Sequence, residues 1–293
     1  MTQARTIDLP DGRRLGLAEY GDPDGAPVFL FHGLPGSRLQ FHPDPEIARG
    51  CGARVLALDR PGIGLSDPQP ARRLLDWPDD VAAVADALGY ARFGVIGLSG
   101  GGPYGAVCAA RLASRLTSVT LISPLGPVDR EEAPGALRDM AFFPRYGLRL
   151  ACGAPWLLRY PSYCFLFLRR FPVLIRMLRP NGGISPHDRV VLATEPDLPA
   201  MFARDMNEAT RQGIAGVLAD ARVASLPWGF KLESITIPVN LWFGDHDALT
   251  PVPMLESIAR RIPHCRVHRF PDEGHFLFFH HLREILMEAA ESI

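Results

Sequence analysis

One serine stands where its hydroxyl could serve as a nucleophile. Residues 97–101 read Gly-Leu-Ser-Gly-Gly, the G-x-S-x-G pattern of a nucleophile elbow, with Ser99 at its centre. An apolar stretch precedes the pattern and a helix-like run of small residues follows it. Such a turn from strand to helix exposes the serine oxygen and aims a helix N-terminus at developing negative charge. The pattern also fits an ordinary loop serine, so the rest of the chain must distinguish the two interpretations.

The chain around this serine alternates between strand-like and helix-like segments. Residues 27–31 and 54–58 are continuous apolar runs, which are typical of parallel strands buried on both faces. Residues 79–88 have helical spacing, and residues 119–122 form a further apolar run after the serine. Glycine-rich loops follow the strand-like runs. This alternation predicts a doubly wound α/β sheet.

The alternation is interrupted once. From about residue 125 to 225 the sequence looks helical, with Pro and Gly between the segments, and strand-like runs return only at 237–243 and 266–270. We therefore predict an α/β fold with a mostly parallel sheet of about eight strands and flanking helices. Residues 1–124 and 226–293 would form this core, and residues 125–225 would be an inserted helical cap.

Composition limits the class of function. The chain has 293 residues, of which 47% are hydrophobic, so it can bury a large core. A net charge of −1 without a basic stripe argues against nucleic acid as a partner. No apolar run approaches the roughly 20 residues that span a bilayer, and no signal-like region follows Met1, so we expect no integral membrane segment. The five cysteines form no C-x-x-C pair, which suits a reducing, cytoplasmic location.

Five short segments together resemble the α/β-hydrolase superfamily. They are His32-Gly33-x-Pro35-Gly36, Asp59-x-Pro61-Gly62-x-Gly64-x-Ser66, the turn at Ser99, Gly244-x-x-Asp247-x-x-x-Pro251 and Gly274-His275. Each pattern is short, but the five occur in the superfamily's order, each at the end of an expected strand. The resemblance covers nearly the whole chain outside residues 125–225 and implies an α/β-hydrolase fold.

The resemblance also implies a catalytic triad, whose order in this superfamily is Ser, acid, His. In this chain the triad would be Ser99, Asp247 and His275. His275 would take the serine proton and pass it to the leaving group, while Asp247 would fix the imidazole tautomer and stabilise its charged form. Asp245 is the alternative acid, and the family pattern favours the second aspartate.

Two oxyanion donors follow from the same resemblance. One is the backbone N–H after the nucleophile, at Gly100, and the other comes from the loop after the third strand, at Leu34. Pro35 has no N–H and cannot take that role. We interpret the adjacent residues Asp59 and Arg60 as a structural pair in a turn.

Four further histidines could suggest a metal. His264 and His268 are four residues apart and His280 and His281 are adjacent, but neither pair has a spaced set of Cys, Asp or Glu partners. A serine triad also needs no metal or other cofactor. We therefore expect no metal site and no cofactor, and we interpret these histidines as surface residues.

The residue types at the site favour ester hydrolysis. Ser99 argues against the dehalogenase and epoxide-hydrolase branches, whose members use aspartate at the elbow. Residues 32–36 are close to the H-G-G-P-G of proline iminopeptidases, but Leu34 departs from it, and residues 140–187 contain no acid for a substrate amine. We therefore expect a carboxylesterase-like serine hydrolase, with a peptidase second. Carbon–carbon bond hydrolases, cofactor-free perhydrolases and ligand-binding proteins of the same fold remain alternatives.

The middle of the expected cap predicts a hydrophobic small-molecule substrate. Residues 141–180 are rich in large apolar and aromatic side chains and carry seven arginines, and acids follow only later, among them Glu195, Asp205 and Glu208. The cap face above Ser99 must form the roof of the pocket, and we expect it to be apolar or aromatic. Hydrophobic acyl or aromatic esters would then be preferred. The arginines also allow a weaker hypothesis, recruitment of an anionic headgroup or membrane surface.

Overall fold

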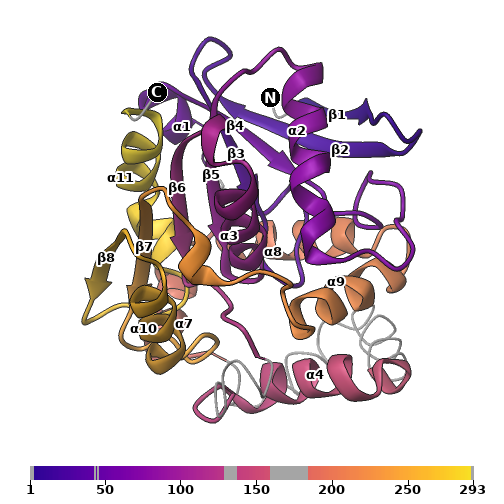
Figure 1. The fold of residues 1–293 in the computed structure, drawn as a ribbon. Coiled ribbons are helices and arrows are strands. Elements are labelled where there is room, and N and C mark those ends of the chain that lie inside the picture. The colour runs from indigo at the N-terminus through magenta and orange to yellow at the C-terminus, as the bar shows by residue number, and fades with distance from the viewer. Residues whose placement is uncertain (1–2, 43, 45, 129–136, 159–183, 292–293) are drawn as a thin grey trace.

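The computed structural model describes residues 3–42, 44, 46–128, 137–158 and 184–291. Its centre is one eight-stranded sheet with the strand order β1-β2-β4-β3-β5-β6-β7-β8 (Figure 1). The strands are β1 (Gln3–Asp8), β2 (Arg14–Gly21), β3 (Ala26–Phe31), β4 (Ala53–Leu58), β5 (Phe93–Leu98), β6 (Leu116–Ile122), β7 (Val239–Gly244) and β8 (Cys265–Phe270). β2 is antiparallel to β1 and β4, and every other pair is parallel. The prediction of an eight-stranded, mostly parallel sheet is confirmed.

Alternation along the strands divides the core between the two faces of the sheet. In β3, Phe29 and Phe31 belong to one buried cluster, and Val28 and Leu30 belong to the other. Helices cover both faces, among them α2 (Trp77–Ala87), α3 (Gly102–Arg111) and α10 (Val252–Arg261) on the first, and α1 (Glu46–Gly50) and α11 (Leu277–Glu291) on the second. The strands are continuously apolar because helices cover both faces.

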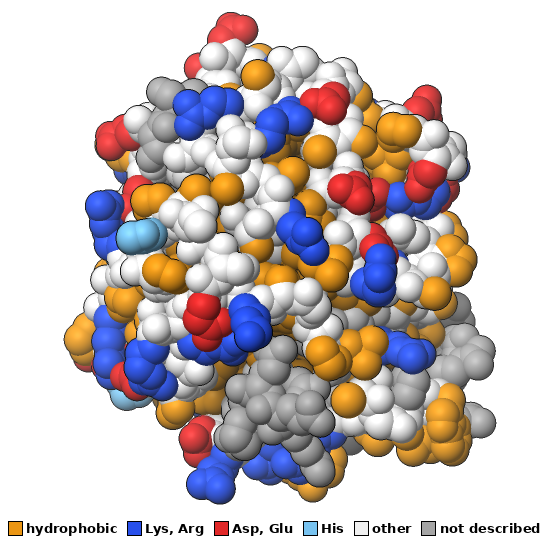
Figure 2. All heavy atoms as spheres, in the orientation of Figure 1, with side chains coloured by type: hydrophobic (Ala, Val, Ile, Leu, Met, Phe, Trp, Pro, Cys, Tyr) orange, Lys and Arg blue, Asp and Glu red, His pale blue; other side chains and the backbone are white. Residues whose placement is uncertain are grey.

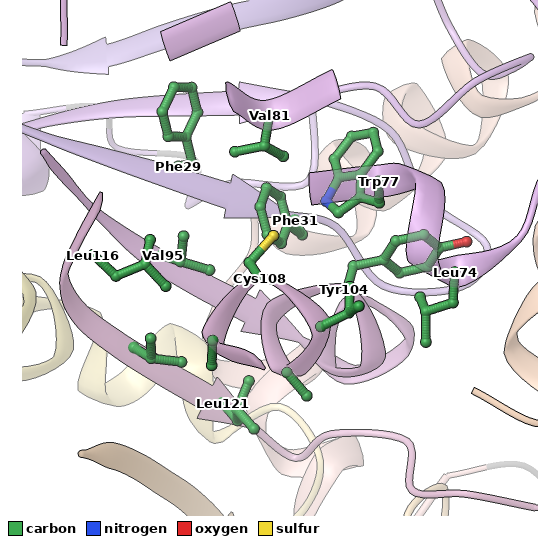
Figure 3. Packing of buried hydrophobic residues seen from close by; sticks show 14 of the residues in the cluster. Phe29, Phe31, Leu74, Trp77, Val81, Val95, Tyr104, Cys108, Leu116 and Leu121 are labelled. Atoms are coloured by element: carbon green, nitrogen blue, oxygen red, sulfur yellow. The ribbon is translucent and has the colours of Figure 1, made fainter. Parts of the chain in front are cut away.

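Aromatic rings connect the first face to the helix that follows Ser99. Figure 3 shows Phe29, Phe31, Trp77 and Tyr104 packed between strands and helices. Trp77 of α2 meets Phe31 and Tyr104 edge-on, with ring centroids 5.3 and 5.6 Å apart. Since Tyr104 lies in the first turn of α3, these contacts help to fix the start of that helix and therefore the turn before it.

Between β6 and β7 the chain leaves the sheet. The described elements there are α4 (Phe142–Gly153), a 3₁₀ turn (Pro155–Leu158), α7 (Pro186–Thr194), α8 (Leu198–Ala209), α9 (Ala215–Ser225) and a second 3₁₀ turn (Leu232–Ser234). The part of this insertion that the structure describes contains no strand. α4 packs against α9 at the end of the molecule where β5 finishes (Figure 1). Residues 129–136 and 159–183 of the expected cap lie outside the described residues.

The surface carries mixed charge. On the face shown in Figure 2, basic and acidic side chains are interspersed. Among the helices of the described ranges, none has the length and hydropathy needed to cross a membrane.

The described cysteines form no disulfide. Cys51, Cys108, Cys152 and Cys265 are free thiols.

The core assignment predicts a large effect of truncating Phe29. Phe29→Ala should lower the free energy of unfolding by about 3–5 kcal/mol, because its ring is fully buried and meets Phe93 edge-on at 4.9 Å. Val267→Ala on β8 is the matched control: Val267 is 44% exposed, and its truncation should change the free energy by about 0.5 kcal/mol or less. Urea unfolding followed by circular dichroism measures both, and equal effects would contradict the assignment.

Candidate active site

Ser99 occupies a sharp turn between a strand and a helix. β5 ends at Leu98, a 3₁₀ turn spans Ser99–Gly101, and α3 starts at Gly102. The φ angle of Ser99 is +52°, a left-handed conformation that costs a non-glycine residue about 1–3 kcal/mol. The surrounding structure must therefore hold this residue in place.

Close backbone packing holds the turn. A Cβ at Gly97 would lie 2.7 Å from the Gly101 carbonyl oxygen, and a Cβ at Gly101 would overlap the carbonyl oxygen of Phe31. These contacts leave no room for a methyl group, so the two glycines allow strand, turn and helix to approach closely. The Ser99 carbonyl also accepts a hydrogen bond from Leu125 N at 2.9 Å. The serine is thereby fixed at the carboxyl end of β5.

Three side chains from separate loops form a hydrogen-bonded chain. Ser99 follows β5, Asp247 follows β7 and His275 follows β8. His275 Nε2 lies 2.9 Å from Ser99 Oγ, and His275 Nδ1 lies 2.8 Å from Asp247 Oδ2. A carboxylate can only accept, so Nδ1 carries the proton and Nε2 is free to take the proton of the serine hydroxyl. The structure brings together the three residues that the sequence analysis singled out.

Both oxygens of the buried Asp247 carboxylate are engaged. Oδ1 accepts hydrogen bonds from Leu249 N and Thr250 N at 2.8 Å each, and Oδ2 accepts one from Thr250 Oγ1 at 2.7 Å. Burial raises the pKa of Asp247, but the charge of His275 and the hydrogen bonds together lower it by more than burial raises it. The net pKa of Asp247 therefore lies below the ordinary value. Asp247 is therefore ionised at neutral pH.

The His275 imidazole is buried beside negative charge. Burial lowers the pKa of His275. The charge and hydrogen bond of Asp247, and then the charge of Asp188, together raise this pKa by more than burial lowers it. The net pKa therefore lies above the ordinary value of 6.5. An imidazole that binds a proton more readily is a better base toward a hydroxyl group.

Asp245, the alternative acid, is paired with an arginine at the surface and not with His275. Asp245 Oδ1 accepts a hydrogen bond from Arg269 Nε at 2.5 Å, and the same arginine donates to Glu256 at 3.1 Å. Arg269 is exposed, so this ion pair lies at the surface. Asp247, and not Asp245, is the residue hydrogen-bonded to His275.

Leu34 and Gly100 lie side by side next to the nucleophile. A Cβ at Gly100 would lie 2.9 Å from Leu34 N, so the two chain segments touch. Gly33 N donates to Gln40 Oε1, and Pro35 has no N–H. Within the described part of the chain, Leu34 N has no acceptor. Leu34 N thus lies next to Gly100 and Ser99 without a partner in the described structure, which suits an oxyanion donor.

A buried arginine shapes the loop that carries Leu34, a role that the sequence analysis did not identify. Arg60 is fully buried, and its Nη1 and Nη2 donate to the carbonyl oxygens of His32 and Gly33 at 2.5 and 2.8 Å. Its Nε and Nη2 also bind Asp220 of α9 at 2.9 and 2.6 Å. The guanidinium therefore orients the peptide groups that immediately precede Leu34.

The charge of Asp220 is balanced by two arginines. Besides Arg60, Arg72 Nη2 binds Asp220 at 2.9 Å, and Tyr104 Oη donates to it at 2.6 Å. Burial raises the pKa of Asp220, but the charges of Arg60 and Arg72 lower it by more than burial raises it. The net pKa of Asp220 is therefore far below the ordinary value. No spacing pattern points to Asp220, which is 160 residues from Arg60 in the sequence.

The interpretation of Asp59 and Arg60 as a pair in a turn is wrong. Asp59 accepts hydrogen bonds from Arg38 N and Nη1, each at 2.7 Å, whereas Arg60 binds Asp220. Both side chains are fully buried, and a buried charge needs a partner in good geometry. Two adjacent opposite charges at a strand end therefore find separate partners.

The four histidines considered for a metal lie beside carboxylates or at the surface. His264 and His280 are exposed, and His268 and His281 lie beside glutamates. Among the residues that the structure describes, no group of three or more His, Cys, Asp or Glu could hold a metal ion.

Two cavities meet at Ser99. The larger has a volume of about 430 Å³, and the only polar side chains among its described lining residues are those of Ser99 and Thr250. The smaller has a volume of about 160 Å³ and is lined by His275 and aromatic rings that include Phe202 and Phe276. A substrate at Ser99 can therefore extend in two directions.

Two helices of the insertion form the wall of the larger cavity. α4 contributes Pro144, Gly147 and Leu148, which lie in the stretch expected to form the roof. α9 contributes Val217, which the sequence analysis did not assign to the pocket. These side chains are apolar. Residues 159–180 of the expected roof lie outside the described part of the chain.

Comparison with known proteins places the chain in a family. Residues 26–282 match the family model described as alpha/beta hydrolase fold. The chain belongs to the α/β-hydrolase fold family. A solved α/β-hydrolase fold protein from Chitinophaga pinensis has a TM-score of 0.68 and 20% identity, covering 98% of this chain and 96% of that one. That likeness supports the fold.

Curated relatives of this α/β hydrolase carry different activities. A poly(3-hydroxyalkanoate) depolymerase from Ectopseudomonas oleovorans is 25% identical over 279 residues, covering 92% of this chain and 85% of that protein. A non-heme chloroperoxidase from Streptomyces lividans is 33% identical over 125 residues, covering 42% of this chain and 45% of that protein. The second match thus spans less than half of either protein. At the level of reaction class, the family and the match to the depolymerase over most of both chains support a hydrolase.

The hydrogen-bond geometry predicts which aspartate controls the imidazole. Asp247→Asn should lower the pKa of His275, because it removes the charge that raises this pKa most. Asp245→Asn is the matched control and should leave the pKa of His275 unchanged, since Asp245 pairs with Arg269. An NMR titration of the imidazole measures both. A larger fall with Asp245→Asn would assign the acid to Asp245.

Proposed function

We propose that this α/β hydrolase is a serine hydrolase that cleaves a carboxylic ester of a hydrophobic small molecule. The observation that carries the proposal is the hydrogen-bonded chain from Ser99 Oγ through His275 to Asp247, which opens on an apolar cavity. A hydroxyl, an imidazole and a carboxylate at these distances are the groups that acyl transfer through a covalent intermediate requires.

The reaction proceeds in two halves. Ser99 Oγ attacks the ester carbonyl carbon while His275 Nε2 takes its proton, and the N–H groups of Leu34 and Gly100 bind the oxyanion. His275 then gives the proton to the alcohol oxygen, the C–O bond breaks, and the acyl group stays on Ser99. Water, deprotonated by His275, attacks this acyl-enzyme and releases the acid. Throughout, Asp247 keeps Nε2 available and stabilises the imidazolium.

The position of the base supports one assignment of the substrate's two parts to the two cavities. The leaving alcohol must receive its proton from His275 Nε2, so it lies on the side of the smaller cavity, which His275 lines. The acyl chain then occupies the larger cavity, of about 430 Å³, whose described lining does not include His275. A substrate that suits this arrangement has a larger, apolar acyl part and a smaller alcohol part.

The polar groups of the insertion disfavour a peptidase. A proline iminopeptidase needs acids to bind the substrate amine. Asp205 accepts hydrogen bonds from Ser37 N and Oγ at 2.7 and 2.6 Å, and Glu208 binds Arg38 at 2.8 Å. Both acids therefore hold loops of the core. The described lining of the larger cavity includes no charged side chain, and an ammonium group there would lose its hydration without gaining a partner.

A cofactor-free perhydrolase is the second candidate. The 33% identity to the Streptomyces lividans chloroperoxidase over 125 residues favours it. In that reaction hydrogen peroxide replaces water as the group that attacks the acyl-enzyme, so Ser99 and His275 keep the same tasks. Measuring peracid formation from an ester and hydrogen peroxide, beside hydrolysis of that ester, distinguishes the two.

The domain roles are part of the proposal. Residues 125–225 act as a cap on the core of residues 1–124 and 226–293, because α4 and α9 wall the cavity at Ser99. A cytoplasmic location is supported by the free thiols of the described cysteines.

The nucleophile assignment predicts the behaviour of Ser99→Ala. This substitution should abolish covalent labelling by a fluorophosphonate and lower kcat for a 4-nitrophenyl ester by about 10⁴-fold or more, because the triad acts as a unit. Ser114→Ala removes an exposed hydroxyl and should change neither. Intact-protein mass spectrometry and initial rates measure the effects. Labelling that persists in Ser99→Ala would place the nucleophile elsewhere, and a wild type that is neither labelled nor active would favour a ligand-binding protein.

The larger cavity predicts a preference for long acyl chains. Over a series of 4-nitrophenyl esters, kcat/KM should rise from acetate to medium-chain acyl groups by about tenfold or more, since each methylene that enters an apolar pocket contributes. Gly147→Leu should move the optimum to shorter chains. Gly147 lines this cavity, and a Cβ there meets nothing within 4 Å, so the added side chain can fill the space.

Gly153→Leu is the control for this experiment. Gly153 lies in the same helix, and a Cβ there also meets nothing within 4 Å, but it is not among the cavity's lining residues. It should leave the chain-length profile unchanged. An acetate optimum in the wild type, or equal profiles for the two variants, would argue against the acyl assignment.

A further inference from the structure

Helix α7 begins with an acid whose two carboxylate oxygens serve different elements. Asp188 is fully buried, and its Oδ2 accepts a hydrogen bond from Ser185 Oγ at 2.7 Å, within the helix's own capping box. Its Oδ1 instead accepts a hydrogen bond from Phe276 N at 2.8 Å. Phe276 directly follows His275. One charge-assisted hydrogen bond therefore joins the insertion to the segment that carries the imidazole.

The segment before His275 is also shaped to receive this carboxylate. A Cβ at Gly274 would overlap Asp188 Oδ1 and would lie 2.7 Å from Ser185 Oγ. Because Gly274 has no side chain, the start of α7 can approach the backbone on both sides of His275. The glycine of the Gly274-His275 motif thus has a specific contact that requires it.

A second contact joins α7 to the segment that carries the acid. The rings of His187 and His246 stack with their centroids 3.8 Å apart and their planes at 10°. His246 directly precedes Asp247, and His246 N donates to the Glu273 carbonyl at 2.9 Å. α7 therefore contacts both segments whose side chains form the Asp247–His275 pair.

Two charged groups face the imidazole in the described structure, and both are negative. Asp247 approaches from the loop after β7, where it is hydrogen-bonded to Nδ1, and Asp188 approaches from α7. Burial lowers the pKa of His275, and the charge of Asp247 followed by that of Asp188 raises it. Asp188 thus favours the imidazolium without a hydrogen bond to the ring.

We propose that Asp188 is a positioning residue for His275. Its carboxylate holds residues 274–276 so that Nε2 faces Ser99, and its charge stabilises the imidazolium that forms during acyl transfer. This inference rests on the proposed function and extends it, because it makes α7 part of the support of the base. Any displacement of α7 would then weaken the base as well as change the shape of the site.

Two substitutions separate the hydrogen bond from the charge. Asp188→Asn keeps an oxygen that can accept from Phe276 N but removes the charge. Its acid limb of kcat/KM and its NMR-measured His275 pKa should both move to lower pH, while kcat on the alkaline plateau stays close to that of the wild type. Asp188→Ala removes both interactions, and its plateau kcat should fall about 10- to 100-fold with KM little changed, because Nε2 is no longer held at its place.

The matched control is Asp197→Asn. Asp197 is an exposed residue at the start of α8 whose side chain makes no capping hydrogen bond, so its substitution should leave the pH profile and the His275 pKa unchanged. If Asp188→Asn is folded by circular dichroism and has the His275 pKa of the wild type, the proposal is overturned and Asp188 is structural only. This test stands even if Asp188→Ala does not fold.

The titration also separates this inference from the proposed function. The His275 pKa can be followed by NMR without any turnover. If the wild type hydrolyses no ester but Asp188→Asn still lowers the pKa of His275, the proposed function fails while the electrostatic role of Asp188 stands. If esters are hydrolysed and neither the pKa of His275 nor the acid limb moves in Asp188→Asn, the proposed function stands and the proposal for Asp188 fails.

Discussion

The buried pair of Asp247 and His275 is the interaction on which the site depends. An ionised carboxylate that leaves water loses several kcal/mol of solvation unless other donors replace the water. The loop after β7 supplies those donors from Leu249 N and from Thr250 N and Oγ1, and His275 supplies a further one. The loops that carry the pair meet because β7 and β8 are parallel neighbours in the sheet, so both strands end at the same edge. The order of the strands thus brings Asp247 and His275 within hydrogen-bond distance of each other.

The helical insertion lines the larger cavity and also holds the loops at this edge of the sheet. Its last three helices each direct one buried aspartate at a different loop of the core: Asp188 of α7 at Phe276 N, Asp205 of α8 at Ser37, and Asp220 of α9 at Arg60. The three charges are balanced differently. Two arginines bind Asp220 and keep it ionised, whereas burial raises the pKa of Asp205 to about 7, because its partners are an amide and a hydroxyl. Because such hydrogen bonds are short and charge-assisted, the insertion fixes the shape of the loops on which the site is built.

The sequence could predict the sheet because its signals are local, and it could predict the meeting of Ser99, Asp247 and His275 because the short motifs that carry them resemble those of the α/β-hydrolase superfamily. Apolar runs mark the strands, glycines mark the turns, and the carboxyl ends of parallel strands share one edge of the sheet. Asp188 and Asp220 could not be predicted in this way. Each is a lone acid in a helical stretch, and their partners lie 88 and 160 residues away in the sequence. The wrong pairing of Arg60 with its neighbour has the same origin, since only adjacent residues suggested a partner.

Different residues of the insertion hold the loops of the core and line the larger cavity, and this separation affects how substrates would be distinguished. Its buried aspartates are engaged with loops of the core, and the side chains that α4 and α9 present to the larger cavity are apolar. Selection in that cavity then depends on shape and buried apolar area, at about 0.8 kcal/mol per methylene. A pocket of this kind separates acyl groups that differ by one methylene only by about 10- to 200-fold. If the larger cavity binds the acyl group as proposed, changes of side chain on α4 and α9 alter the preferred acyl group while the loops held by Asp188 and Asp220 keep their geometry.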